Sequence, residues 1–463
     1  MKICIIGAGV SGWIACSLLK KIDLVQEVTI IGSNKIPSIG VGESTTLNFV
    51  ENFLDENNFL DEFVKKSDAS VKYGVYYKNW SERSFIHHFK NHNLFLRNNI
   101  NPISWGQSLA NKPFDLHIHD ILGNNLWNFI HKNEVSLDRK EHLHSWHFDA
   151  GKFSEFLKEK NINDVKVNYI EDTIIGCKFN DKDTIDYVIG EKNKKYKFDY
   201  FVNCCGDNNL NENIFLEEYY DFSSVLLTNK ALVYPLKYKD KRKEFHPYTL
   251  AKTMNCGWRW ITPTQSRIGT GYVFSDKHIS VDEATNEFLK DIGDMSISPH
   301  LVEFRPRLNK KPFKKNNCVI GMSQGFLEPL DAPGLALSIL SIDRLRNLLL
   351  GNDNIENMNS NLMVEYSWWV SFILHQYKTC YRNDSSFWVD QKNVKFDFYE
   401  RLMGCLQDVP DHLSERFEFM MLFHTSSGKD LQWNSMIKEL PVILKDIDGE
   451  TVHHMDYIQK FLI

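Results

Sequence analysis

Residues 2–12 read "KICIIGAGVSG", and this stretch decides the fold. An apolar run typical of a short buried strand leads into Gly7, Gly9 and Gly12, which have the spacing G-x-G-x-x-G. A helical pattern follows, and "EVTIIG" (27–32) predicts the next strand. The sequence therefore predicts a β–α–β unit that opens a doubly wound α/β sheet.

The spacing of the glycines predicts a dinucleotide site. Gly7 permits a tight turn, Gly9 lets the backbone approach a pyrophosphate, and Gly12 allows close packing of helix against strand. Val10 and Ser11 open the helix, whose first N–H groups would face the phosphates.

The acidic residue that usually holds the adenosine ribose is absent. It is expected about 20 residues further on, where this chain has Gly32. The ribose would then be held by the backbone or by Ser33, so we expect weak, exchangeable cofactor binding.

A second glycine loop follows as Gly40-Val41-Gly42-Glu43-Ser44. Either it is a simple turn, or it is a mobile segment that lies against the cofactor and hinges at its two glycines.

The bulk composition is that of an ordinary soluble globular protein of 463 residues, 43% apolar and 25% charged. A net charge of −6 does not indicate a nucleic-acid partner, and no apolar run is long enough to predict a membrane span. Nine cysteines, with Cys204 and Cys205 adjacent, argue against a disulfide framework and favour a reducing, cytoplasmic location. Aromatic residues make up 13% of the chain, which indicates either a large core or a ring-lined pocket.

Further motifs extend over most of the chain. They are "IPSIGVGEST" (36–45), "SVKYGVYYKNW" (70–80), "WHFDAGKF" (146–153), "GWRWITP" (257–263), "RIGTGYVFS" (267–275), "GFLEPLDAPG" (325–334) and "HQYKTCYRNDSSFW" (375–388). With the glycine-rich start, these motifs resemble those of the flavin-dependent tryptophan halogenases and their wider superfamily. The family's Trp-x-Trp-x-Ile-Pro motif is present with Thr262 in place of the isoleucine.

The resemblance implies a Rossmann-type FAD-binding α/β fold of the single-component-monooxygenase kind, with a mixed β-sheet substrate region and a helical C-terminal part. We expect a discontinuous FAD-binding module over 1–350, with a substrate-region insertion around 85–145 and a strand-rich part at 208–315. A mostly helical substrate-side module would occupy 351–463.

The resemblance also implies the cofactors and partners. FAD would act as FADH2, supplied by a separate NAD(P)H-dependent flavin reductase, because no second nucleotide motif is visible. Reduced flavin, oxygen and a halide ion would give hypohalous acid. Gly321 and Leu330 would join the glycine loops in binding the flavin.

Lys72 matches the family's catalytic lysine, which captures hypohalous acid as a hydrogen-bond donor or as a haloamine. We expect a strand over Val71–Tyr77 on which Lys72 shares a face with Gly74 and Tyr76, where the glycine leaves room.

Asp331 stands where the family has its partner glutamate. It either serves as the catalytic carboxylate or caps the helix that follows it. The neighbouring Glu328 would orient the loop or substitute for Asp331.

Pro333 and Gly334 match the two positions whose backbone N–H groups bind halide in the family. Proline has no N–H, so one donor is lost. We therefore expect a looser halide site that favours bromide or iodide over chloride.

Trp258, Trp260 and Pro263 belong to the diagnostic motif. The resemblance implies that the tryptophans wall the flavin from the substrate, and stiff, bulky indoles suit that task. Their presence as an ordinary core pair on one strand face is compatible with this role. We expect them to shape the site without taking part in bond chemistry.

The substrate pocket is expected from the C-terminal helical part and from 85–145, with His87, His88, Phe89, Trp105 and Trp127. Residues that grip the ammonium and carboxylate of free tryptophan are not recognisable, so an indole, phenol or other small electron-rich aromatic is expected. No recurring ligand spacing predicts a metal.

Two other functions stay open: a flavin-dependent aromatic hydroxylase, and a degenerate flavin-binding protein. The oligomeric state also stays open.

Overall fold

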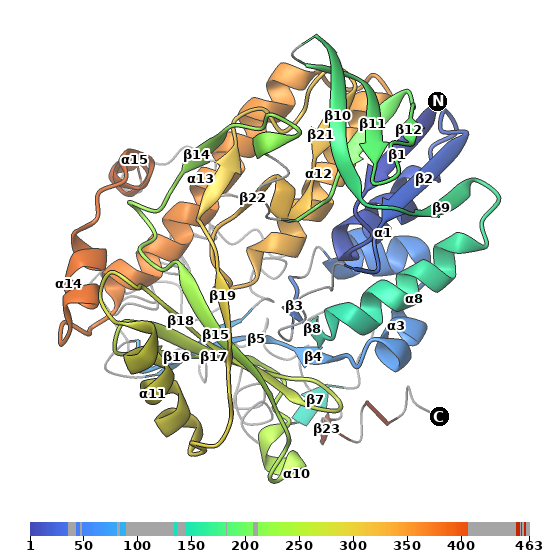
Figure 1. Ribbon diagram of the computed structural model, residues 1–463. Coiled ribbons are helices and arrows are strands. Elements are labelled where there is room, and N and C mark those ends of the chain that lie inside the picture. The colour runs from blue at the N-terminus through green and yellow to red at the C-terminus, as the bar shows by residue number, and fades with distance from the viewer. Residues whose placement is uncertain are drawn as a thin grey trace, which may run out of the picture. The chain divides into compact units, whose positions relative to one another are not determined.

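The computed structural model (Figure 1) describes residues 1–35, 43–46, 49–80, 84–88, 134–136, 144–181, 183–206, 212–405, 451–453, 455 and 458–459, with the side chains of 51, 85–88, 134–136, 402–405 and 451–453 excepted. The chain forms two compact units, each assembled from three separate stretches. Unit 1 comprises Met1–Asp68, Phe148–Ser224 and Glu303–Ser367, and unit 2 comprises Ala69–His147, Val225–Val302 and Trp368–Ile463.

Unit 1 is built on a five-stranded parallel sheet in the order β21-β13-β1-β2-β9. Its elements are β1 (Lys2–Ile6), α1 (Val10–Leu19), β2 (Glu27–Gly32), β3 (Glu43–Ser44), the π-helix η1 (Val50–Asp55), α3 (Leu60–Lys66), α8 (Ala150–Ile162), β9 (Val167–Glu171), β10 (Ile174–Asp181), β11 (Thr184–Gly190), β12 (Lys195–Tyr196), β13 (Tyr200–Asn203), β14 (Tyr219–Asp221), β20 (Arg307–Asn309), β21 (Asn317–Val319), the 3-10 helix η2 (Gly321–Ser323), β22 (Gly325–Phe326) and α12 (Pro333–Leu349).

Strand β1 is buried on both faces, as a central parallel strand requires. Cys4 and Ile6 pack against side chains of the antiparallel sheet β10-β11-β12. On the other face, Ile5 approaches Gly12 of α1. This Rossmann-type arrangement confirms the α/β fold that residues 2–12 predict.

Much of the aromatic content forms the core of unit 1. Seven phenylalanines in or next to η1, α3, β8 and α8 stack edge-on and face-on with ring centroids 5.1 to 6.3 Å apart, namely Phe49, Phe53, Phe59, Phe63, Phe148, Phe153 and Phe156. These rings are packing residues. For this cluster, the large-core interpretation of the aromatic content is therefore correct.

Unit 2 contains a seven-stranded mixed sheet in the order β19-β15-β18-β17-β16-β5-β6. Its elements are β4 (Ser70–Lys72), β5 (Gly74–Lys78), β6 (Phe85–His88), β7 (Glu134–Ser136), β8 (Ser145–Phe148, of which Phe148 belongs to unit 1), β15 (Lys230–Leu236), α10 (Lys241–Glu244), β16 (Thr249–Met254), β17 (Gly257–Pro263), β18 (Ile268–Phe274), α11 (Val281–Ile292), β19 (His300–Glu303), α14 (Ser386–Asn393), α15 (Asp397–Cys405) and β23 (Thr451–His453).

Helix α11 covers one face of this sheet. Its residues Ala284 and Phe288 pack on Leu232, Tyr272 and Phe274. Ser280 caps the helix through a capping box with Glu283, which fixes where it begins.

The strand expected over Val71–Tyr77 is two strands, so that prediction is wrong. β4 pairs with β8, whereas β5 joins the seven-stranded sheet beside β16. The chain changes sheets at Tyr73, whose N–H donates to the carbonyl of Pro247 at 2.8 Å. Because of this break, Lys72 does not share a strand face with Gly74 and Tyr76.

Helix α12 is followed by Gly351, whose φ of 76° ends it in the left-handed conformation that glycine favours. Helix α13 (Ile355–Thr379) contributes residues to both units. The boundary expected near residue 350 lies inside unit 1, because α12 and the start of α13 belong to that unit. In the part of the chain that the structure describes, no helix is both long and apolar enough to cross a membrane.

Candidate active site

The glycine loop after β1 has the shape that a pyrophosphate needs. Gly7 has φ 110°, and a Cβ there would lie under 3.0 Å from the carbonyl oxygen of Cys204. A Cβ at Gly12 would come equally close to the carbonyl oxygen of Gly7. Among the described residues, no atom beyond the local backbone lies within 4 Å of where a Cβ at Gly9 would stand. The loop is therefore closed on the protein side and open at Gly9, which fits a dinucleotide.

Distant parts of unit 1 meet at this loop. Gly321 has φ 71°, and a Cβ there would lie under 3.0 Å from the Oγ of Ser11. The Ser11 hydroxyl is 3.4 Å from the Ser338 hydroxyl of α12, and the Ser154 hydroxyl of α8 donates to the Ala8 carbonyl at 3.2 Å. Unit 1 thus brings Gly321 next to Ser11. The sequence alone does not indicate Ser154 or Ser338.

The packing at position 32 explains why the chain lacks the acidic residue that usually holds the adenosine ribose. A Cβ at Gly32 would lie under 3.0 Å from the Cβ of Ala8 in the glycine loop, so no side chain fits there. The next residue, Ser33, accepts hydrogen bonds from the Thr173 hydroxyl at 3.0 Å and from the Lys35 N–H at 3.3 Å. These two contacts use Oγ as an acceptor, so its own proton is available to donate to another group.

Of the second glycine loop, Gly40, Val41 and Gly42 lie outside the described residues. The Oε2 of Glu43 accepts the backbone N–H of Ala150 at 2.8 Å, where a carboxylate stabilises the N-terminus of α8. The Oγ of Ser44 is buried and has no hydrogen-bond partner among the described residues.

The loop before α12 contains two buried carboxylates. Glu328 is 0% exposed and Asp331 is 5% exposed, and Leu330 between them is fully buried. Asp331 and Ala332 both have φ 59°, a left-handed conformation that costs residues with a Cβ about 1 kcal/mol each. The N-cap of α12 is Ala332, so the alternative that Asp331 caps this helix is wrong.

Pro333 is the first residue of α12, as the proline without an N–H suggests. No atom of the described chain other than the local backbone lies within 4 Å of where a Cβ at Gly334 would stand. The Ser338 hydroxyl donates to the Gly334 carbonyl at 2.8 Å. The positive end of α12 therefore begins beside open space.

Lys72 lies on a buried polar face of the β4–β8 ladder. Ser70 pairs with His147 and Lys72 pairs with Ser145, so all four side chains are on one face. Each of these residues is 0% exposed. The lysine is therefore shielded from bulk water.

A hydrogen-bonded chain connects this face to the seven-stranded sheet. The Ser70 hydroxyl donates to the carbonyl of Pro263 at the end of β17 and contacts Nδ1 of His147 at 3.3 Å. Nε2 of His147 is 2.8 Å from the Thr249 hydroxyl of β16. Within unit 2, Lys72 and Pro263 are thus held near one another through Ser70.

Trp258 and Trp260 lie on one face of β17, 2% and 5% exposed, with ring centroids 6.3 Å apart and planes tilted by 57°. The intervening Arg259 points to the other face, where Nη1 pairs with Asp291 at 2.7 Å. A Cβ at Gly271 would lie under 3.0 Å from the Trp260 ring, so this glycine makes room for the indole. Nothing in the sequence alone indicates this role for Gly271.

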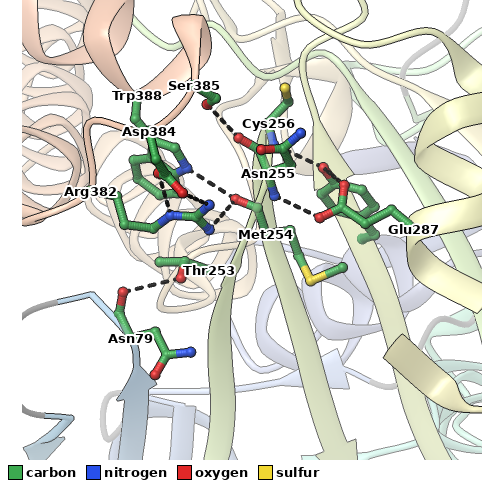
Figure 2. A network of polar contacts seen from close by, with 11 residues as sticks. Asn79, Thr253, Met254, Asn255, Cys256, Glu287, Arg382, Asp384, Ser385 and Trp388 are labelled. Carbon is green, nitrogen blue, oxygen red and sulfur yellow. Dashed lines mark hydrogen bonds and ion pairs between the residues drawn. The ribbon is translucent and has the colours of Figure 1, made fainter. Parts of the chain in front are cut away.

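The turn between β16 and β17 is fixed on several sides (Figure 2). The Met254 carbonyl accepts from Nη1 of Arg382 at 2.7 Å and from Nε1 of Trp388 at 3.0 Å. The Asn255 carbonyl accepts from the Ser385 hydroxyl at 2.6 Å, and its N–H donates to Glu287 at 2.8 Å.

Arg382 is itself held by a bidentate pair with Asp384, at 2.8 and 2.7 Å. On the other side of the turn, burial and the nearby Glu287 carboxylate raise the pKa of Tyr272, which keeps its phenol protonated to donate to Glu287. The turn that starts the tryptophan strand therefore has little freedom to move.

The expected site residues fall into two sets. Unit 1 holds Gly7, Gly12, Ser33, Gly321 and the loop 328–334, and unit 2 holds Lys72, Trp258, Trp260 and Pro263. His87, His88, Phe89, Trp105 and Trp127, expected at the substrate pocket, have side chains outside the described residues. In the described part of the chain, no group of three or more His, Cys, Asp or Glu residues could hold a metal ion.

The glycine loop and the parallel sheet that supports it define a Rossmann-type dinucleotide-binding α/β protein. Its family follows from sequence comparison: the tryptophan halogenase model matches residues 2–433. The chain belongs to the tryptophan halogenase family and is an FADH2-dependent halogenating enzyme.

Relatives of this chain include the tryptophan 7-halogenase RebH of Lentzea aerocolonigenes, 30% identical over 72% of this chain and 67% of the relative. The tryptophan 7-halogenase KtzQ of Kutzneria sp. is 27% identical over 85% of this chain and 79% of the relative. Among solved structures, a tryptophan halogenase from Shewanella frigidimarina has the same fold, with a TM-score of 0.86 at 21% identity, covering 100% of this chain and 97% of that one.

Proposed function

We propose that this enzyme halogenates a small electron-rich aromatic compound by passing hypohalous acid to Lys72. The observation that carries this proposal is the complete burial of Lys72 on a polar face of β4 and β8. A buried amine that must keep its charge is costly, so its retention favours a function over a surface role.

FAD would be held by the open backbone at Gly9, the start of α1 at Ser11, the hydroxyl of Ser33 and the turn at Gly321. When bound in its reduced form, the flavin would supply two electrons that bring oxygen to the peroxide level, and this peroxide-level oxygen would oxidise halide to hypohalous acid. We infer that a separate NAD(P)H-dependent reductase delivers it.

The Lys72 ammonium would donate a hydrogen bond to the oxygen of hypohalous acid, which polarises the O–X bond and makes the halogen more electrophilic. The ring carbon bonds to the halogen as the O–X bond breaks, the departing hydroxide takes a proton from the Lys72 ammonium and leaves as water, and the ring proton passes to a carboxylate, so the proton lost by one group is gained by the other. We assign that carboxylate to Asp331, with Glu328 as the alternative, since both are buried in the loop before α12.

Trp258 and Trp260 would separate the flavin from the aromatic substrate. Two buried indoles on one strand face offer bulk with few rotamers, and Gly271 and the held turn at Met254 restrict them further. Neither ring would take part in bond chemistry.

The halide site is proposed to favour bromide or iodide over chloride. Pro333 removes one backbone donor, and the space beside Gly334 suits a larger, less hydrated anion. The relatives are tryptophan halogenases by name. We propose an indole or phenol as the substrate here and not free tryptophan, because the groups that would grip an amino acid are not recognisable.

We infer a cytoplasmic location, which the eight free cysteines of the described chain support. Family membership does not favour the alternative of an aromatic hydroxylase.

The test combines the enzyme with a flavin reductase, FAD, oxygen, a panel of indoles and phenols and each halide, with products read by mass spectrometry. Halogen isotope patterns are expected, and a product that gains only oxygen would contradict the proposal. Lys72→Ala should abolish halogenation while flavin reoxidation continues. A Lys72→Ala variant that still halogenates would overturn the role of the lysine.

A further inference from the structure

The buried face around Lys72 contains a second basic group that the proposed reaction does not use. His147 is 0% exposed, and both of its ring nitrogens contact hydroxyls. An imidazole this deeply buried is tolerated only when hydrogen-bonded. The groups that His147 contacts therefore indicate which part of the structure it holds in place.

The hydrogen bonds define the protonation of His147. A carbonyl only accepts, so the Ser70 proton is used by the Pro263 carbonyl. Nδ1 of His147 must then carry the proton and donate to the Ser70 oxygen. Nε2 lies 2.8 Å from the Thr249 hydroxyl, which can accept from a protonated Nε2 or donate to an unprotonated one, so the bond to Ser70 is the one that requires a proton on Nδ1.

These hydrogen bonds fix the position of β4, the strand that carries Lys72. Ser70 and His147 attach β4 to β17 and β16, and Nε2 of Gln265 donates to the Ala69 carbonyl at 2.8 Å. Because His147 pairs with Ser70, it is the diagonal neighbour of Lys72, with backbones about 7 Å apart by ladder geometry. The lysine is therefore fixed immediately beside a hydrogen-bonded anchor.

We propose that His147 is a positioning residue for Lys72, acting through Ser70. This inference rests on the proposed function, because the accuracy it supplies matters only if Lys72 hands halogen to a ring carbon. Catalytic groups must be held within about 0.5 Å of the productive geometry, and an error of about 1 Å can cost about 100-fold in rate.

The experiment compares four enzymes: wild type, His147→Gln, His147→Asn and His278→Asn. Asn places an amide N–H near the position of Nδ1 and keeps the link to Ser70, whereas Gln reaches only toward Thr249. His278 is the matched control, because its side chain is 3% exposed and its ring contacts Ser275 at 2.8 Å and Asp390 at 3.2 Å, away from Lys72. The measurement is halogenated product per flavin oxidised, alongside the melting temperature.

We expect His147→Gln to lower this yield about tenfold. His147→Asn should recover most of it, and His278→Asn should keep the wild-type yield even where its melting temperature falls. Equal yields in all four enzymes, or yields that follow melting temperature alone, would overturn the proposal. If His147→Gln does not fold, Ser70→Ala removes the same link. A wild-type yield in Ser70→Ala would then overturn the proposal.

A second readout needs neither flavin nor turnover. Long-range proton–nitrogen correlations of the free protein, with Ser70→Ala to identify the resonance, should place the His147 proton on Nδ1. An Nδ1 without a proton would rule out the hydrogen bond from His147 to Ser70. Failure of the proposed function looks different, since wild type would then give no halogenated product or Lys72→Ala would retain it.

Discussion

The indole of Trp260 lies over Gly271 of the neighbouring strand, in the space that any side chain at that position would need. The two residues are direct cross-strand partners in the β17–β18 ladder. The pair therefore sets where one wall of the proposed barrier lies. This relation also yields a prediction.

Gly271→Ala should displace the Trp260 ring. Overpacking of this kind costs about 1–3 kcal/mol of unfolding free energy. We expect less halogenated product per flavin oxidised and altered tryptophan fluorescence. Gly176→Ala is the control, since the three atoms nearest to its Cβ would all belong to the Ile189 side chain, at 3.2 Å or more. Unchanged fluorescence and yield in Gly271→Ala would show that the indole is not held by this contact.

Substitutions at Gly9 and Gly12 should have different effects, the first on FAD binding and the second on the stability of the fold. Gly9→Ala places a methyl group in open space, so the melting temperature should hold while FAD affinity, measured by calorimetric titration, falls. Gly12→Ala meets the Gly7 carbonyl and should lower the melting temperature itself. Wild type is expected to bind FAD weakly, given Gly32 and Ser33. Unchanged FAD affinity in Gly9→Ala would contradict a pyrophosphate at this loop.

Pro333→Ala should shift halide use toward chloride. The substitution restores a backbone N–H at the first residue of α12, and one hydrogen bond is worth about 1 kcal/mol, or about fivefold in the ratio of chlorinated to brominated product. Competition assays at equal halide concentrations measure this ratio. Wild type that prefers chloride would refute the proposed halide preference. An unchanged ratio in Pro333→Ala would show that the missing N–H does not set it.

Because His246 is buried, we expect the folded protein to lose stability in mild acid. Burial lowers the pKa of His246 from 6.5 to about 4, although its contact with the Tyr248 carbonyl opposes the shift. Between pH 6.5 and pH 4, His246 therefore stays neutral in the native state but binds a proton in the unfolded chain. This contribution is complete above pH 6.5 and falls as the pH drops toward 4.

Urea unfolding measures this loss. Between about pH 7.5 and about pH 5, the free energy of unfolding should fall by about 2 kcal/mol on account of His246. His246→Asn should remove that part of the pH dependence, since asparagine does not titrate. The same pH dependence in both proteins would show that His246 is not the group responsible.

Structural properties that depend on adjacent residues could be predicted from the sequence. The turn at Gly7, the opening at Gly9 and the helix after Ser11 follow from local geometry that only certain residues permit. The alternation that puts Trp258 and Trp260 on one face is equally local. A missing N–H at Pro333 can be read directly from the residue type.

The tertiary structure alone decided how distant strands meet. The break at Tyr73 depends on a carbonyl of Pro247, far along the chain, and Gly271 matters only because β18 pairs with β17. The buried face of Lys72 likewise needs β8 to supply His147. Pairing of strands that are far apart in sequence is set by packing of the whole unit, and no periodicity within one strand encodes it.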